Sequence, residues 1–294
     1  MDGGTKLNLC VMVSGGLGLK ALMHLVEGKD QVVCVFTDSG SHSIIELCDE
    51  HSIPCFKGNP RNGKGKTFIE KYNVDVLASI NYLFLIEKDL IEYPKGLAFN
   101  IHGSLLPKYR GRTPHVWAII NGETKTGITA HRIDADCDTG DIIHQVEVPI
   151  EQNDTGAVIL KKFEELYIPM IDNVLDSFRK DSVTYRKQND QEATFFGKRT
   201  PESGHIKWEW TQEQIRNWVR AQAFPYPGAF VWLNGQKITI DRVEKSTFKP
   251  VVKGSIGQLY RFEDDWYVLC QDGTVRLSEV RTNSELLSEN KILE

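Results

Sequence analysis

The chain has 294 residues, a formal net charge of −5 and a sequence pI of about 5.9. Hydrophobic residues make up 40% of it and charged residues 26%, which is ordinary for a soluble globular protein with one large and one small domain. We expect a cytoplasmic protein with no membrane partner, because no apolar run could cross a bilayer and the start lacks the basic region of a signal peptide. The acidic balance argues against a nucleic-acid partner, since such proteins present a basic face to phosphates.

The six cysteines are scattered along the chain without C-x-x-C pairs. We therefore predict neither a disulfide framework nor a zinc site, and we expect no metal. Cys137 lies next to Asp138, but no base in the sequence is paired with its thiol.

Strands and helices alternate in the first half of the chain. Apolar runs predict strands over residues 7–13, 31–37, 54–56, 74–79 and 96–102, with helices over 19–27, 43–51, a segment ending at 68–72, and 87–91. Alternation at this spacing predicts βαβ units, so we expect an α/β fold with a Rossmann-like, mainly parallel sheet.

A glycine turn, Ser14-Gly15-Gly16, follows the first strand. Backbone N–H groups at such a helix start can bind an anion, which would make Ser14, Gly15 and Gly16 substrate-binding residues. Tight packing of the turn explains the glycines equally well. If the turn binds a ligand, a nucleotide is the expected one.

Two polar side chains end the strand at 96–102. Asn100 and His102 are two residues apart, so both point to one face, at the carboxyl end of a strand, where open α/β sheets bind ligands. A later polar loop contains Asp134, Asp136 and Asp138 and could return a carboxylate to the histidine. Such a carboxylate is expected to raise the pKa of His102. Each residue alone also has a plain structural explanation, and only the combination indicates a site.

Beyond this loop the pattern predicts an antiparallel strand pair at 126–133 and 142–149 and a long helix over 154–178, with Asp154 as its N-cap. The expected domains are residues 1–185, a polar linker at 186–203, and residues 204–294. Short apolar runs in the last part, with hairpin turns at Asn234-Gly235 and Asp272-Gly273, predict a small OB-like β-barrel.

A series of motifs begins with NIHGSLLPKYRG at residues 100–111 and continues with Pro114, Trp117-Ala118-Ile119, Gly122-Glu123 and Asp138-Thr139-Gly140-Asp141. This series resembles the signature of the folate-dependent formyltransferases. This resemblance implies 10-formyltetrahydrofolate as formyl donor and places Asn100, His102 and Asp138 at the family's catalytic positions. It also implies a pterin pocket around the apolar loop at 80–86. The residues that it assigns to cofactor binding are Leu83, Leu85, Asp134 and Asp136, and those that we add for the substrate are Lys108, Tyr109 and Arg110.

Three functions stay open at this point. The favoured one is N-formylation of a nucleotide-linked amino sugar for surface polysaccharide such as the O-antigen of lipopolysaccharide, with dTDP-4-amino-4,6-dideoxyglucose as the best guess by analogy. The PYPGAF and LLPKYRGR segments look closer to that branch, and residues 37–44 lack the basic insertion typical of the alternative, methionyl-tRNA formyltransferase. A catalytically inactive folate-binding module is the third alternative. The oligomeric state is open, with a homodimer as one alternative.

Overall fold

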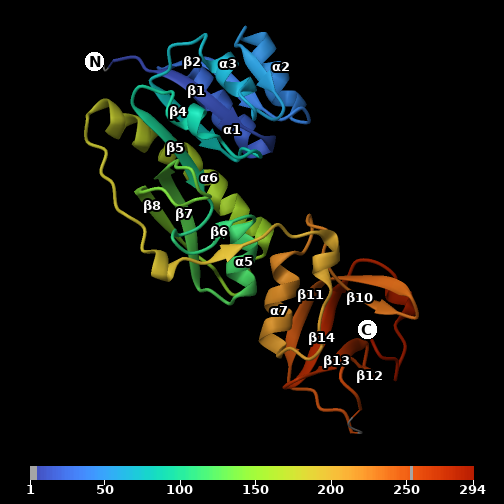
Figure 1. Cartoon of the computed structure of the whole chain (residues 1–294). Coiled ribbons are helices and arrows are strands. Elements are labelled where there is room, and N and C mark those ends of the chain that lie inside the picture. Colours follow the sequence, from blue (N-terminus) through green and yellow to red (C-terminus); the bar gives the residue numbers. More distant parts are fainter. Residues whose placement is uncertain (1–4, 252–253) are drawn as a thin grey trace. The chain divides into compact units, whose positions relative to one another are not determined.

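A computed structural model describes residues 5–251 and 254–294 (Figure 1). By contacts the chain forms two compact units: Met1–Gly111 with Gly127–Val148 and Phe163–Phe195, and Arg112–Thr126 with Pro149–Lys162 and Phe196–Glu294. The second unit thus includes two segments from the middle of the chain. The domain boundaries expected at 185 and 204 stay a prediction.

A seven-stranded sheet forms the core of the first unit, with the strand order β3-β2-β1-β4-β5-β7-β8. β1, β2, β3, β4 and β5 run parallel, and β7 runs antiparallel to β5. The inner strands are almost continuously apolar because a parallel sheet is covered on both faces. This confirms the mainly parallel, Rossmann-like α/β fold. The strands are β1 (Asn8–Val13), β2 (Gln31–Thr37), β3 (Cys55–Lys57), β4 (Val76–Ile80), β5 (Leu97–His102), β7 (Lys125–Arg132) and β8 (Ile142–Pro149).

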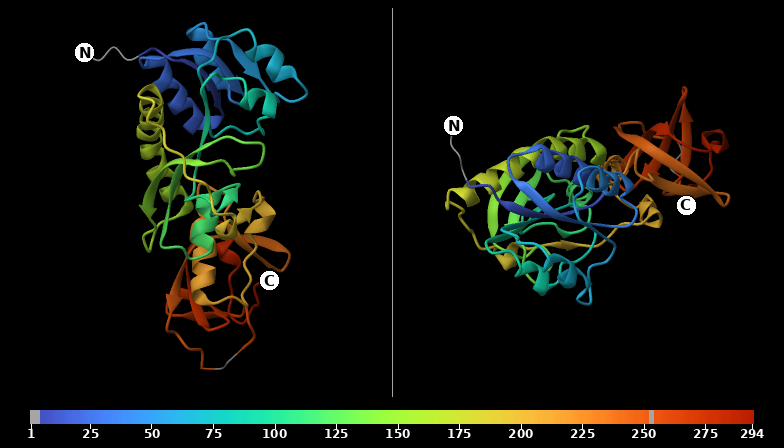
Figure 2. Two further views of the ribbon diagram at one scale, coloured as in Figure 1. Left: turned by 60° about the vertical axis from the view of Figure 1, so that its left-hand side comes forward. Right: turned by 90° about the horizontal axis from the view of Figure 1, so that it is seen from above.

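Helices cover the sheet. α1 and α6 lie side by side, joined by ion pairs from Lys20, His24 and Lys29 of the α1 region to acidic residues of α6 (Figure 2). A cluster of apolar side chains around Phe36 and Phe68 packs against alternate residues of β1 and β2. The helices of this unit are α1 (Gly15–Glu27), α2 (His42–Glu50), α3 (Lys64–Ile69), α4 (Lys88–Ile91) and most of α6 (Gly156–Arg179), whereas α5 (Pro114–Ile120) belongs to the second unit.

The largest differences between the predicted and observed helix starts are at α1 and α6. α1 begins at Gly15, four residues before the predicted start, and a Cβ on Gly18 would lie 3.0 Å from Cβ of Val13, so this glycine permits close helix–strand packing. For α6, Thr155 caps the helix, since its Oγ1 accepts the N–H of Val158 at 3.3 Å. Asp154, the predicted N-cap, instead accepts from Lys162 Nζ at 2.6 Å.

The second unit contains α7 (Gln212–Ala221) and a five-stranded sheet of the order β10-β11-β14-β13-β12. Its strands pair antiparallel around a buried apolar core. The hairpin at Asn234-Gly235 is confirmed, because Leu233 pairs with Gln236 and both turn residues have positive φ. The second turn comprises Gln271-Asp272, one residue earlier than predicted, because Gly273 already pairs with Cys270. The strands are β10 (Ala229–Leu233), β11 (Gln236–Ser246), β12 (Leu259–Phe262), β13 (Asp265–Cys270) and β14 (Gly273–Val280).

The remaining elements are short. They are β6 (Arg110–Gly111), β9 (Phe195–Phe196) and the 3-10 turns Asp190–Glu192, Pro201–Gly204 and Ser284–Leu286. Within the described residues, no helix combines the length and apolarity needed to span a membrane.

Candidate active site

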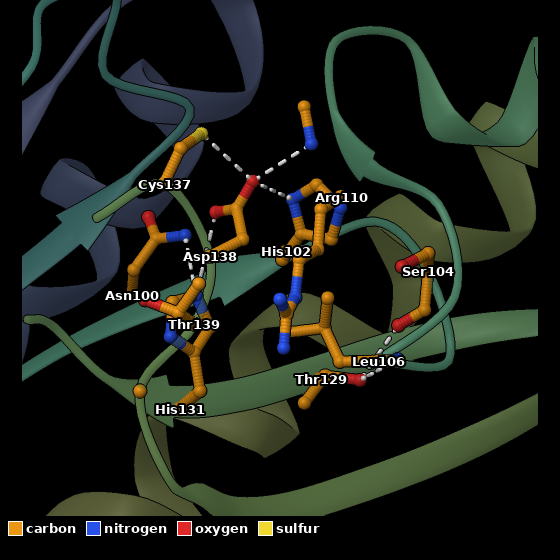
Figure 3. Close-up of polar contacts among 12 residues, drawn as sticks. Asn100, His102, Ser104, Leu106, Arg110, Thr129, His131, Cys137, Asp138 and Thr139 are labelled. Atoms are coloured by element: carbon orange, nitrogen blue, oxygen red, sulfur yellow. Dashed lines mark hydrogen bonds and ion pairs between the residues drawn. The ribbon is translucent and has the colours of Figure 1, made fainter. Parts of the chain in front are cut away.

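Four polar side chains meet at the carboxyl end of β5 (Figure 3). Asn100 and His102 come from β5, His131 from the neighbouring strand β7, and Asp138 from the turn that follows β7. Asn100 lies opposite His131 in the antiparallel register, which brings both side chains to the same end of the sheet. The structure thus brings together the three residues predicted to be catalytic and adds a second histidine.

Asp138 is the charged centre of this group. Its Oδ2 accepts the backbone N–H of Gly111 at 2.9 Å and the thiol of Cys137 at 3.3 Å, and only 12% of its side chain is exposed. Burial by itself would raise the pKa of this carboxyl. At the low pH where this carboxyl titrates, the positive charges of protonated His102 and His131, together with the hydrogen bonds to Asp138, outweigh burial and hold its pKa well below the ordinary value. Asp138 is therefore ionised at neutral pH.

His102 is buried, and its hydrogen bond identifies its neutral tautomer. Nε2 lies 2.8 Å from the carbonyl oxygen of Tyr109, which can only accept, so Nε2 carries the hydrogen. Nδ1 is then an unprotonated acceptor that faces Oδ2 of Asp138 at 3.6 Å. Two acceptors cannot hydrogen-bond to each other, and one added proton would join them.

The expected effect of Asp138, to raise the pKa of His102, is present but does not decide the net shift. Burial lowers the pKa of this imidazole from 6.5, and the opposing effect of the Asp138 charge is smaller. The sequence indicated the neighbouring carboxylate but not the loss of hydration at the end of a buried strand. His102 is consequently neutral near pH 7, beside an ionised carboxylate.

His131 is a site residue that the sequence analysis missed. Its Nδ1 lies 2.7 Å from the carbonyl oxygen of Arg132 and so donates to it, which leaves Nε2 as an acceptor. Nδ2 of Asn100 donates to that Nε2 at 3.1 Å. This bond fixes the orientation of the Asn100 carboxamide and leaves its second N–H available. The only sequence signal was the position of His131 near the end of a predicted strand, because strand register is not readable from the sequence.

The residues predicted to bind the cofactor lie in two loops. Leu83 and Leu85 follow β4 and are 45% and 57% exposed. β4 is the parallel neighbour of β5, so this loop begins beside the end of the strand that carries Asn100 and His102. Asp134 accepts from Thr139 Oγ1 at 2.6 Å in the turn that leads to Asp138, and Asp136 is exposed.

The residues predicted to bind the substrate are partly engaged within the protein. The carbonyl of Ser14 accepts from Asn81 at 2.9 Å, and the Gly15 N–H donates to Ser41 Oγ at 3.0 Å, while Gly16 is exposed. The guanidinium of Arg110 is buried and donates to Gln188 and Asp190. Lys108 is exposed, and Tyr109 is buried with a φ of 61°.

Comparison with known proteins identifies the family. Residues 9–174, more than half of the chain, match the family described as formyl transferase, and residues 198–290 match the formyl transferase C-terminal domain. The chain belongs to the formyl transferase family. The resemblance inferred from the residues around Asn100 and Asp138 is thereby confirmed.

Solved formyl transferases share this fold. WlaRD, a sugar 3N-formyl transferase solved with dTDP and 5-N-formyl-THF, matches with a TM-score of 0.71 and 21% identity over 95% of this chain and 100% of its own. An N-formyltransferase from Helicobacter canadensis, in complex with folinic acid and dTDP-3-aminofucose, gives 0.70 and 20% over 94% and 100%. A methionyl-tRNA formyltransferase from Clostridium thermocellum gives 0.55 and 19% over 83% and 95%.

Proposed function

We propose that the protein transfers the formyl group of 10-formyltetrahydrofolate to the amino group of a nucleotide-linked amino sugar. Family membership makes formyl transfer the class of reaction. The observation that carries the proposal is the ionised Asp138 carboxylate, 3.6 Å from an unprotonated nitrogen of His102, beside the partly buried Asn100. This arrangement offers a hydrogen-bond donor and a proton acceptor at one point, which is what acyl transfer to an amine requires.

The donor fits the residues around this point. Leu83 and Leu85 present exposed apolar side chains that suit the flat face of a pterin, and the carboxylates of Asp134 and Asp136 are exposed acceptors that suit its amino groups. When bound, 10-formyltetrahydrofolate supplies the electrophilic formyl carbon. These cofactor contacts are part of the proposal.

The residues divide the chemistry between them. As the acceptor amine bonds to the formyl carbon, charge develops on the formyl oxygen, and the free N–H of Asn100 donates to it, a contribution on the order of 3 kcal/mol in a site without water. The amine becomes an ammonium, and the His102–Asp138 pair takes its proton. That proton then passes from the pair to the folate nitrogen, as the bond between this nitrogen and the formyl carbon breaks. The products are the formamide and tetrahydrofolate.

In the structure, the hydrogen on Nε2 of His102 is engaged by Tyr109 O, so we assign the oxyanion to Asn100 and proton acceptance to Nδ1 of His102. Asp138 stabilises the imidazolium that forms.

For the acceptor we propose a dTDP-linked amino sugar, with dTDP-4-amino-4,6-dideoxyglucose as the first candidate and surface polysaccharide as the destination. Two of the solved relatives were crystallised with dTDP or a dTDP-amino sugar, at 20–21% identity, and the chain is acidic overall. The rival acceptor, methionyl-tRNA, is represented by a relative with a lower TM-score.

A panel assay tests the proposal. The protein is incubated with 10-formyltetrahydrofolate and, separately, with dTDP- and UDP-linked 3-amino and 4-amino sugars and with methionyl-tRNA, and release of tetrahydrofolate and the mass of the acceptor are followed. We expect a 28-Da gain, the mass of a formyl group less one hydrogen, on a dTDP-amino sugar and none on tRNA. Turnover with tRNA alone would replace the sugar by the tRNA function, and binding of folate without turnover would indicate the inactive module.

A further inference from the structure

The turn between β7 and β8, residues 133–141, carries Asp138, and we call it the active-site turn. The chain segment after α6 contacts this turn through the side chain of Gln188. This residue lies at the start of the stretch expected to be a linker. Its Nε2 donates both hydrogens, one to the carbonyl oxygen of Asp138 at 2.8 Å and one to that of Gly140 at 2.7 Å. Its Oε1 accepts from Arg110 through Nε at 3.2 Å and Nη2 at 2.9 Å. All the hydrogen-bonding groups of this half-buried amide are therefore used.

The turn that Gln188 holds has a demanding backbone. Asp138 has a φ of 59°, in the left-handed region that few residues other than glycine adopt. A Cβ on Gly140 would lie 1.9 Å from the carbonyl oxygen of Arg132, so the backbone of the turn lies directly against the end of β7. Gln188 donates to two carbonyl oxygens of this turn, those of Asp138 and Gly140. A backbone of this kind persists where surrounding contacts fix it.

Gln188 also holds the opposite side of the site. Arg110, which it binds, is preceded by Tyr109, the acceptor for His102 Nε2, and followed by Gly111, the donor to Asp138 Oδ2. Nearby, the backbone N–H groups of Tyr109 and Arg110 donate to the side chain and backbone of Thr194. One amide thus connects the peptide that orients His102 with the turn that carries Asp138.

We propose that Gln188 is a positioning residue, which sets the separation between the His102 imidazole and the Asp138 carboxylate. This role deepens the proposed formyl transfer and rests on it for its effect on turnover. Errors of about 1 Å in the placement of a proton acceptor cost on the order of a hundredfold in rate, so loss of the amide should lower kcat. All the hydrogen bonds of Gln188 are made within the protein, so we expect KM to stay nearly unchanged.

Three variants separate the alternatives. Gln188→Leu removes every hydrogen bond of the side chain at similar volume. Gln188→Glu keeps the acceptor for Arg110 but removes both donors to the turn, so it isolates the contacts with Asp138 and Gly140. Gln191→Leu is the matched control, because it makes the same change three residues later at an exposed glutamine. We expect both Gln188 variants to lose kcat by about tenfold or more, with each KM within about twofold, and the control to behave as the wild type.

A second readout does not depend on turnover. Hydrogen exchange of the Gly111 amide, the donor to Asp138 Oδ2, should become about tenfold faster in both Gln188 variants, because the carboxylate is no longer held against it. The Arg110 amide, bonded to Thr194 O at 2.9 Å, should exchange at an unchanged rate.

The outcomes are distinguishable. Unchanged Gly111 exchange and unchanged kcat in both variants would overturn the role of Gln188, as would an equal loss in Gln191→Leu. A kcat loss in Gln188→Leu but not in Gln188→Glu would also overturn it, since Arg110 alone would then be the relevant contact. Faster Gly111 exchange in a protein without formyl transfer would support the positioning of the turn and count against the proposed reaction.

Discussion

Replacement of Asp138 by asparagine removes the charge at the centre of the site with little change in shape. Asparagine tolerates the left-handed backbone, so the φ of 59° adds no new strain. The amide can still accept the Gly111 N–H through its oxygen. That oxygen then keeps the place of Oδ2 opposite the bare Nδ1 of His102, and the NH2 group faces Nε2 of His131, so no carboxylate charge remains to stabilise a proton on His102. Asp138→Asn should therefore suppress proton acceptance specifically.

The size of the effect follows from the separation of the two groups. A unit charge on His102 and one on Asp138, 3.6 Å apart, attract by about 4–5 kcal/mol at an effective dielectric constant of about 20. Each 1.36 kcal/mol corresponds to about a factor of ten in rate, so complete loss of this attraction would cost about three orders of magnitude. Rearrangement and a new hydrogen bond recover part of it. We expect kcat to fall by about a hundredfold to a thousandfold.

Single-turnover kinetics, in which enzyme exceeds 10-formyltetrahydrofolate, measures this loss directly because product release does not contribute. Asp181→Asn is the matched control, since Asp181 is exposed and also has a positive φ of 51°. Its rate should equal that of the wild type. A rate for Asp138→Asn within about twofold of the wild type, or a loss confined to KM, would refute the assignment of Asp138 as the charge that stabilises protonated His102.

The remaining predictions concern the other site residues. Asn100→Ala should lower kcat by about a hundredfold through loss of the oxyanion donor. His131→Phe should lower kcat by about tenfold through loss of the acceptor that orients Asn100. Unchanged kcat in both variants, with folding stability equal to that of the wild type, would contradict these roles. Because burial lowers the pKa of His102, its NMR titration in the free enzyme should have a midpoint below 6.5, and kcat/KM should fall as the pH drops through that midpoint and stay level above it. A midpoint above 6.5 would contradict the neutral state of His102.

Much of the fold follows from local patterns in the sequence. The apolar runs of β1, β2, β4 and β5 are long enough and sufficiently separated by helices to predict a parallel sheet. The site at the end of β5 follows in turn, because Asn100 and His102 alternate with buried residues and end the strand. The Asn234-Gly235 hairpin has an equally specific local signal. The start of α7 carries another local signal, the capping box formed by Thr211 and Gln214.

The rest depended on contacts between distant segments. His131 reaches Asn100 only through the register of β7 on β5, and Gln188 reaches the Asp138 turn from a polar stretch that looks like any linker. The direction of the His102 pKa shift depends on the balance between lost hydration and a nearby charge, and burial is a property of the assembled fold. Secondary structure could thus be predicted from the local sequence, whereas the electrostatics of the site depend on contacts that form only in the folded chain.

The central claim is most directly tested by following the formyl carbon itself. We would mix the enzyme with 10-formyltetrahydrofolate labelled with ¹³C in the formyl group and with dTDP-4-amino-4,6-dideoxyglucose, and record ¹³C NMR spectra over time. We predict that the label moves quantitatively to a formamide on the sugar nitrogen, and that Asn100→Ala, His102→Ala and Asp138→Asn each slow this transfer by about a hundredfold or more. Label that remains on the folate, or that leaves it as formate at the same rate with and without any amino acceptor, would contradict the account.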